Sequence, residues 1–184
     1  QTGSVRRSSS HCSGSGLVRI NQLTIRSCES RDEGLLLKWR NDPASILWSR
    51  SRRPVGVEEH ARWFQSVFFD PNIQIFIGFF PNMETKKNQE DSVGMVRFER
   101  ETEAWCVSIY VHPFSRGRGV ARELLGGGIE MLSNLSNGRL DLIAWVHEAN
   151  APSKQLFASA GFRFDRQEGE FVRMKRSPQT ISET

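Results

Sequence analysis

The sequence predicts a mixed α/β (α+β) fold in a single domain, on three observations. Its 184 residues suffice for one hydrophobic core and leave little room for a second. Its composition, with 38% hydrophobic and 25% charged residues, is typical of globular proteins. Its apolar patterns follow the order β-α-α-β-β-β-α-β-α-β-β along the chain, with no internal repeat. Strands and helices therefore alternate within one unit.

The two ends of the chain are expected to lie outside the domain. Residues 1–16 are rich in serine and glycine and have almost nothing to bury, so we expect a disordered tail or the remnant of a cloned tag. The domain is expected to span 17–176, followed by a short C-terminal tail at 177–184. No basic-then-apolar leader opens the sequence, which argues against a secretory signal.

The first third of the domain predicts a strand and two helices. Apolar residues alternate within 21–28, which indicates a strand. Residues 30–33 have the S-x-x-E form of a capping box, so a helix is expected to follow and to end at Pro43. A second helix is expected over 58–69, where apolar residues recur at helical spacing, and Pro71 ends it.

The middle of the chain predicts three strands rich in β-branched and aromatic residues. Polar segments separate them, and the segment 86–91 is expected to form a solvated hairpin loop. The strands are expected over 74–80, 92–99 and 105–111.

The last third predicts a helix from about 120, with three glycines at 126–128. Each glycine costs about 1 kcal/mol relative to alanine inside a helix. Either this helix packs very closely on a sheet or it frays at that point. A strand over 140–147, a short helix over 150–160 and a terminal hairpin with strands at 162–164 and 170–175 are then expected.

Charge and cysteine content limit the classes of function. The net charge of +4 is mild and spread along the chain, which suits an anionic ligand. No basic-aromatic module appears, which argues against nucleic acid as a partner. No apolar run is long enough for a bilayer, so no membrane partner is expected. Three cysteines without C-x-x-C spacing favour a reducing, cytoplasmic setting and no bound metal.

The segment 110–125, YVHPFSRGRGVARELL, carries the strongest chemical signal. It places two glycines between a strand and a helix, and a helix N-terminus after a strand offers unpaired N–H groups and a positive dipole end. Such a site suits a phosphate or diphosphate. A Walker A loop is excluded because no Gly-Lys precedes Ser or Thr, and G-x-G-x-x-G fails because Arg122 occupies the third glycine position.

Two motifs resemble the GCN5-related N-acetyltransferase (GNAT) family. The first is R-x-x-G-x-A, formed by Arg116, Gly119 and Ala121, and the second is NAPSKQLFASAGF at 150–162. The resemblance covers roughly 17–175. It implies one GNAT-like domain with a mixed, mostly antiparallel twisted sheet, about four flanking helices and a splayed fourth and fifth strand. It also implies acetyl-CoA as co-substrate. A homodimer is compatible with it.

The resemblance implies where coenzyme A binds. Main-chain amides of the glycine turn are expected to hold the diphosphate, and a main-chain N–H of the fourth strand to polarise the thioester carbonyl. The implied cofactor-binding residues are Ile109, Val111, Arg116, Gly117, Arg118, Gly119, Val120, Ala121, Arg122, Asn150, Ser153 and Phe157.

The chain departs from the family at two catalytic positions. Many members have a tyrosine where this chain has Phe157, and that hydroxyl is thought to protonate the leaving thiolate. Ser153, a water molecule or Tyr110, the sole tyrosine, is expected to replace it. Many members also have a glutamate where this chain has Cys106. On strand alternation Cys106 shares a polar face with Ser108 and Tyr110, which we take as the candidate active face.

A base for the amine and the identity of the amine stay open. His60, His147 and Glu148 are candidate bases, and His60 is equally a half-buried core histidine. The segment WRNDP at 39–43 and the arginines that follow resemble enzymes acting on nucleotide-linked amino sugars. Arg50, Arg52 and Arg53 are candidates for gripping a diphosphate or form a solvated loop, and the tryptophans nearby either stack a base or fill the core. An N-terminal acetyltransferase of ribosomal proteins and a non-catalytic acetyl-CoA sensor are the alternatives to a small-molecule amine acetyltransferase.

Overall fold

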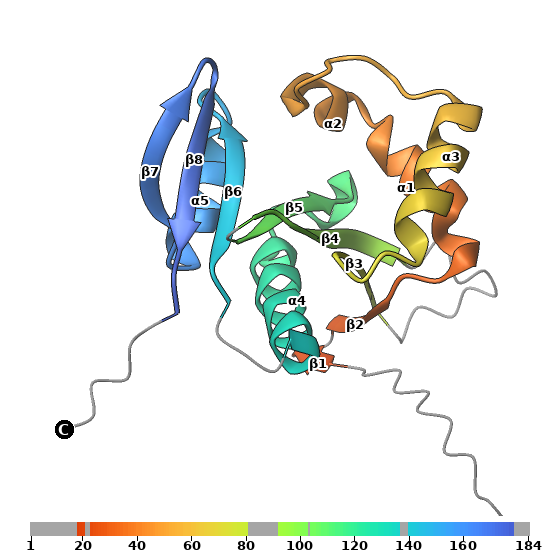
Figure 1. Ribbon diagram of the computed structural model, residues 1–184, viewed down its shortest axis with the longest axis horizontal. Helices are drawn as coiled ribbons and strands as arrows, with labels where there is room; N and C mark the ends of the chain where they lie inside the picture. The colour runs from red at the N-terminus through yellow and green to blue at the C-terminus, as the bar shows by residue number, and fades with distance from the viewer. Residues whose placement is uncertain (1–17, 21–22, 81–91, 103, 137–139, 179–184) are drawn as a thin grey trace, which may run out of the picture.

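The computed structural model describes residues 18–20, 23–80, 92–102, 104–136 and 140–178. The expected N-terminal tail, the polar segment 86–91 and all but two residues of the expected C-terminal tail lie outside these ranges. The described residues form one eight-stranded sheet in the order β1-β2-β3-β4-β5-β6-β8-β7 (Figure 1).

The sheet and its helices account for most of the described chain. The strands are β1 Val18–Ile20, β2 Leu23–Ser27, β3 Ile73–Phe79, β4 Ser92–Arg100, β5 Trp105–Val111, β6 Leu142–His147, β7 Arg163–Glu168 and β8 Phe171–Arg176. The helices are α1 Glu33–Arg40, α2 Pro43–Trp48, α3 Val57–Phe68, α4 Val120–Ser136 and α5 Ala151–Ser159, with short 3₁₀ turns η1 Ser30–Asp32 and η2 Pro113–Ser115. This is the mixed α/β domain that the sequence predicts.

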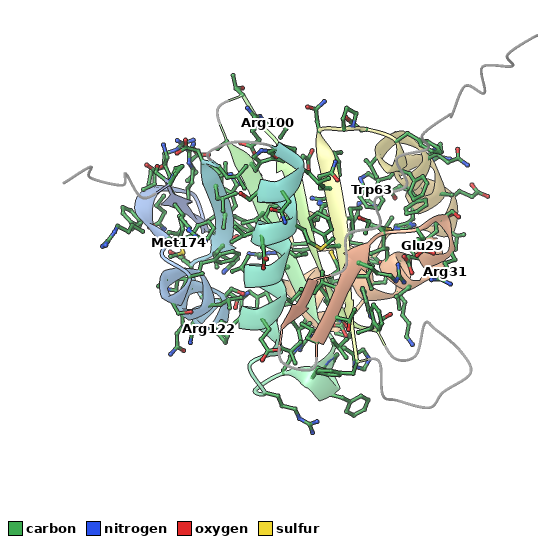
Figure 2. All side chains as sticks on the ribbon, turned by 90° about the horizontal axis from the view of Figure 1, so that it is seen from below. Glu29, Arg31, Trp63, Arg100, Arg122 and Met174 are labelled. Atoms are coloured by element: carbon green, nitrogen blue, oxygen red, sulfur yellow. The ribbon has the colours of Figure 1, made fainter. Side chains whose placement is uncertain are left out.

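Helices cover both faces of the sheet, and each face has its own core. Helix α4 lies along one face, which we call the α4 face (Figure 2). Helices α1 and α3 cover the opposite side of β3, β4 and β5, which we call the α1/α3 face. The α4 face is filled by residues such as Val96, Phe98, Leu124, Leu132 and Ala144, and the α1/α3 face by Leu36, Trp39, Phe64, Ile75, Ile77 and Tyr110.

Close packing of α4 on β4 explains the last of its three glycines. Gly127 and Gly128 are buried, and a Cβ at Gly128 would lie 2.4 Å from Val96 Cγ1 and 3.2 Å from Phe98 Cε2. At Gly126 the same atom would meet nothing within 4 Å. Of the two alternatives for this helix, close packing is therefore the correct one, and α4 continues unbroken to Ser136.

The sheet opens between β5 and β6, which are its one parallel pair within the described residues. Strand β5 pairs with β4 along its whole length, from Trp105 to Val111. It pairs with β6 only at Trp105↔Leu142 and Cys106↔Ile143. Beyond Cys106 the two strands diverge, since β6 continues to His147 paired with β8 alone. The splay expected for the fourth and fifth strands is confirmed, at β5 and β6 in the present numbering.

The segment before α3 differs from the expectation. The expected first helix is α1, which ends at Arg40, before Pro43. Pro43 itself begins a further helix, α2, because proline suits the first helical turn and Asp42 caps it by accepting the Ala44 N–H at 3.0 Å. The described chain thus has five α-helices rather than about four. The capping box is also one residue earlier than expected, formed by Glu29 and Asp32 at the start of η1.

The edges of the sheet extend further than expected. Strand β1 was not expected from the sequence, and it pairs with β2 in antiparallel register. Strand β7 runs to Glu168 rather than to 164, and Gly169, with φ of 56°, makes the turn into β8. The residues of β7 are all exposed, so their burial pattern carries no strand signal.

Candidate active site

At the gap between β5 and β6, main-chain N–H groups of β5 point to the side where β6 no longer pairs with them. The Trp105 N–H donates to Asp141 O at 2.8 Å, toward β6, and the His112 N–H donates to Val93 O at 2.8 Å, toward β4. Successive residues of a strand direct their N–H groups to opposite sides. Ile109 and Val111 therefore direct theirs toward the gap, where β6 no longer pairs with β5.

The chain leaves β5 through η2 and enters a glycine turn that leads into α4. Gly117 and Gly119 have φ of 74° and 82°, in the region that favours glycine. A Cβ at either position would meet nothing within 4 Å, so backbone conformation rather than crowding requires the glycines. The turn is open and it precedes the N-terminus of a 17-residue helix. This arrangement fits a diphosphate group.

Two arginines of this turn are engaged within the protein. The Arg122 N–H donates to Gly119 O at 2.9 Å, so it begins the helix ladder. Arg116 turns its side chain back: Nε donates to Val111 O at 2.9 Å, and Nη2 lies 3.6 Å from Asp42 Oδ1. We therefore narrow the candidate main-chain cradle to Gly117–Ala121 and assign the Arg116 side chain to fixing the end of β5.

The second motif forms α5, on the other side of the gap (Figure 1). Asn150 caps this helix by accepting the Ser153 N–H at 3.2 Å. Phe157 is 3% exposed and packs against Phe162 with ring centroids 5.1 Å apart. Its ring fills the core of the α4 face, and a phenylalanine has no acidic proton to give. Ser153 lies half-buried in the first turn of α5.

Tyr110 is a buried tyrosine near the end of β5, ahead of the cradle. Its side chain is 8% exposed on the α1/α3 face, stacked on Trp39 with ring centroids 5.2 Å apart. The Arg116 guanidinium lies over the same ring, with Cζ 5.9 Å from the centroid. Burial and the neighbouring Asp42 carboxylate raise the pKa of Tyr110 to about 12, so the hydroxyl stays protonated at neutral pH.

Ser108 and Cys106 occupy the same face of β5 as Tyr110. Ser108 is half-buried and lies opposite Arg97 of β4. Burial, with a smaller contribution from Glu101, raises the pKa of Cys106 to about 12. The thiol is therefore protonated at neutral pH, and it is neither a nucleophile nor a base there.

His60 lies apart from this group. It is 3% exposed in α3, packed against Trp63 and Phe64, and neither ring nitrogen has a hydrogen-bond partner in the described part of the chain. Burial lowers its pKa, against a smaller opposite effect of Glu33. No hydrogen bond or ring contact between described residues joins His60 to β5, so the core interpretation of His60 is the one that the structure supports.

Residues 48–53, which we call the strap, follow from the end of α2 and contact side chains at β6 and β8. The Trp48 ring lies 5.3 Å from the His147 ring, and Arg52 Nη2 lies 2.5 Å from Glu170 Oε2. Asn41 closes the base of this segment through two hydrogen bonds to the main chain of Val55, at 2.7 and 2.8 Å. Figure 1 shows α2 between β6 and the pair of α1 and α3.

His147 belongs to this bridge rather than to an open catalytic position. Its Nδ1 faces the Ala149 N–H at 3.1 Å, and its Nε2 faces Arg52 Nη2 at 2.9 Å. Both ring nitrogens of His147 thus face N–H groups of the protein itself. Neither nitrogen is open to a substrate amine. Glu148 is exposed and accepts a hydrogen bond from Gln167 at 2.8 Å.

Asp42 is the site residue that the sequence reasoning missed. It lies within the quoted WRNDP segment, where it caps α2 and approaches Arg116. An Asp followed by Pro is an N-cap signal, and this signal was available in the sequence. Its ion pair with Arg116 spans 74 residues of chain and carries no local signal.

The described residues also limit the class of site. They contain no group of three or more His, Cys, Asp or Glu side chains arranged to hold a metal ion. None of their helices combines the length and the apolar character needed to cross a membrane.

The sequence matches a known family and a known protein. Residues 22–163 match the family model described as Acetyltransferase (GNAT) domain. A Bacillus subtilis protein named "Putative phosphinothricin acetyltransferase YwnH" is 28% identical over 141 residues, which cover 76% of this chain and 83% of that protein.

Two solved structures share the fold at low sequence identity. Spermidine N-acetyltransferase from Vibrio cholerae, in complex with CoA and spermine, superposes with a TM-score of 0.71 at 18% identity, covering 86% of this chain and 96% of that one. N-acetyltransferase PseH from Campylobacter jejuni superposes with a TM-score of 0.60 at 17% identity, covering 86% and 99%.

Proposed function

This chain belongs to the GNAT family of acetyltransferases, and we propose that it transfers an acetyl group from acetyl-CoA directly to the primary amine of a nucleotide-linked amino sugar. The observation that carries the proposal is the gap between β5 and β6, beside which the glycine turn opens. An acyl carrier can lie on the α4 side of this gap and an amine on the α1/α3 side.

Main-chain groups hold the carrier in this proposal. The N–H groups of Gly117–Ala121 bind the diphosphate, supported by the dipole of α4. Asn150 and Ser153 fix the start of α5 on the other side of the pantetheine arm, and Phe157 supplies apolar packing there. Acetyl-CoA acts as a co-substrate, and the chemistry needs no metal.

The end of β5 supplies the N–H groups that the acetyl transfer needs. The amine nitrogen attacks the thioester carbon, and the N–H groups of Ile109 and Val111 stabilise the negative charge that develops on the carbonyl oxygen. The C–S bond then breaks, and the thiolate takes a proton that the attacking nitrogen gives up. A thiol pKa of about 8.5 makes thiolate a tolerable leaving group.

Tyr110 assists this step as a hydrogen-bond donor. A phenol with a pKa of about 12 is a weaker acid than the thiol, so it donates a hydrogen bond without giving up its proton. Ser108, two residues earlier on the same face, is placed to orient the amine, and Ser153 is the second hydroxyl candidate. We assign His60 to the core for the reasons given above.

The choice of an amino sugar rests on the resemblance of WRNDP at 39–43 and the arginines that follow, and on the basic strap that they form. The relatives widen the choice, because one carries the name of a phosphinothricin enzyme and another of a spermidine enzyme. A cytoplasmic setting is part of the proposal. Cys28 and Cys106, the two cysteines in the described residues, are both unpaired, as expected of a reducing compartment.

Release of free thiol from acetyl-CoA tests the function. The acceptors are a uridine-diphosphate-linked amino sugar, phosphinothricin, spermidine and a peptide with a free N-terminus. We expect thiol release only with an acceptor present, and fastest with the nucleotide-linked sugar. Binding of acetyl-CoA with no acceptor-dependent release would identify a sensor instead.

A further inference from the structure

Arg50 is held in a fixed position by two aromatic rings. Its Cζ lies 4.9 Å from the Trp145 ring centroid and 4.7 Å from the Phe171 ring centroid. The two rings come from neighbouring strands, since β6 and β8 pair from Leu142↔Arg176 to His147↔Phe171. Contacts with two rings restrict a guanidinium that would otherwise be mobile, and they use the face of the guanidinium without occupying its N–H groups.

The other two arginines of the strap have carboxylate partners, whereas Arg50 has none within the described chain. Arg52 pairs with Glu170, and Arg53 donates to both oxygens of Glu59 at 2.7 and 2.9 Å. No hydrogen bond or ion pair from a described residue reaches the Arg50 guanidinium, which is exposed. Arg50 thus combines restricted geometry with five uncommitted donors.

The rings that hold Arg50 lie on the acceptor side of the gap. Leu142, Ala144 and Val146 of β6 belong to the core of the α4 face, so Trp145 and His147 point to the opposite side. On β5 that side carries Ser108 and Tyr110. The last paired residues are Cys106 and Ile143. Ser108 and Trp145 are each two residues beyond this pair, so they flank the opening at the same level.

We propose that the acceptor amine carries an oxyanion group, a phosphate or a carboxylate, and that Arg50 is the residue that binds it. This inference rests on the proposed function and makes its substrate class narrower. The guanidinium fork matches two oxygens of such a group, and its positive charge disfavours a polycation such as spermidine in the same place. Arg50 is a specificity-determining residue, remote from the reacting atoms.

Matched probes test the inference without relying on turnover. The full chain is saturated with coenzyme A, and binding is measured for glucosamine 6-phosphate against glucosamine and for L-methionine against L-methioninamide. We expect the phosphate or the carboxylate probe to bind about 10- to 100-fold more tightly than its neutral partner, as one charge-assisted contact provides. The arm that shows the preference identifies the oxyanion.

Variants connect the preference to Arg50. Arg50→Met is expected to abolish it, and Arg50→Lys, which keeps the charge without the fork, to weaken it. The control is Arg166→Met, because Arg166 also stacks on Trp145, at 5.4 Å, but has Glu168 and Asp165 as partners. It should retain the wild-type preference. Coenzyme A must stabilise every variant as it stabilises the wild type, which verifies folding.

The inference is overturned if neither anionic probe exceeds its neutral partner, if spermidine binds as tightly as both, or if Arg50→Met keeps the preference. These results differ from failure of the proposed function. If the proposed function alone fails, the wild type shows the anion preference and Arg50→Met loses it, but no amine in the acceptor panel releases thiol from acetyl-CoA.

Discussion

Asp42 Oδ1 lies 3.6 Å from Arg116 Nη2, which joins the cap of α2 to the start of the glycine turn. This ion pair therefore links the two elements that we propose lie beside the acceptor and the acyl carrier. Arg116 also donates to the Val111 carbonyl, and its guanidinium lies over the Tyr110 ring. Asn in place of Asp42 would keep the cap and remove the charge.

We predict that Asp42→Asn lowers the pKa of Tyr110. Burial is the largest cause that raises this pKa to about 12, and the Asp42 carboxylate is the second. Tyr110 is the sole tyrosine of the chain, so tyrosinate absorbance after a rapid pH jump reports it alone. The wild type should ionise near pH 12 and the variant at lower pH. An unchanged midpoint would show that Asp42 does not act on Tyr110.

Tyr110→Phe is expected to reduce kcat/KM about tenfold, the loss of one hydrogen bond worth about 1.4 kcal/mol. The KM for acetyl-CoA should not change, because the carrier is held by main-chain groups. Steady-state thiol release with the best acceptor measures both. A thousandfold loss would contradict this account, since it would make Tyr110 a true proton donor.

Alanine at two glycines of α4 is expected to change the stability of the protein in opposite directions. Gly126→Ala is expected to stabilise the protein by about 0.5–1 kcal/mol, since the site is open and alanine favours helix. Gly128→Ala is expected to destabilise it by about 1–3 kcal/mol, because the new Cβ meets Val96, which is rigid and fully buried. Urea unfolding measures both, and effects of the same sign would refute the close packing of α4 on β4.

His60 is expected to make stability fall in mild acid. Burial lowers its pKa in the folded state, while the unfolded chain takes up the proton near the ordinary pKa of about 6.5. Stability is therefore full above about pH 6.5 and is lost as the pH falls below it. His60→Gln should flatten the dependence of Tm on pH between about 7 and 5. Equal slopes in His60→Gln and the wild type would contradict the assignment.

Much of the fold was predictable because its signals are local. Strand β5 was predicted at its observed bounds, 105–111, and α5 to within one residue at each end. Helix α2 was missed because Pro43 was taken as a stop, although proline after Asp42 is equally a start. Strand β7 was placed too short because exposed residues such as Arg163 and Glu168 show no alternation.

The site divides in the same way. The glycine turn was predictable because Gly117 and Gly119 mark a backbone conformation that other residues avoid. The role of the Arg116 side chain was not, because its partners Val111 and Asp42 depend on how β5 meets α2. That Arg50 has no carboxylate partner among the described residues was also beyond sequence reasoning, because the sequence does not indicate which of three neighbouring arginines pairs with a carboxylate.

The central claim is that the amides of Gly117–Ala121 bind the diphosphate of the acyl carrier, and calorimetry on Gly119→Ala tests it most directly. The titrants are acetyl-CoA and S-acetylpantetheine, which lacks the diphosphate. The control is Gly169→Ala, which also places alanine at positive φ, 56°, but in the turn between β7 and β8. We predict that Gly119→Ala weakens acetyl-CoA binding at least about tenfold, the value of one hydrogen bond to a charged group, and leaves S-acetylpantetheine binding unchanged. Equal losses for both ligands, or no loss for acetyl-CoA, would contradict it.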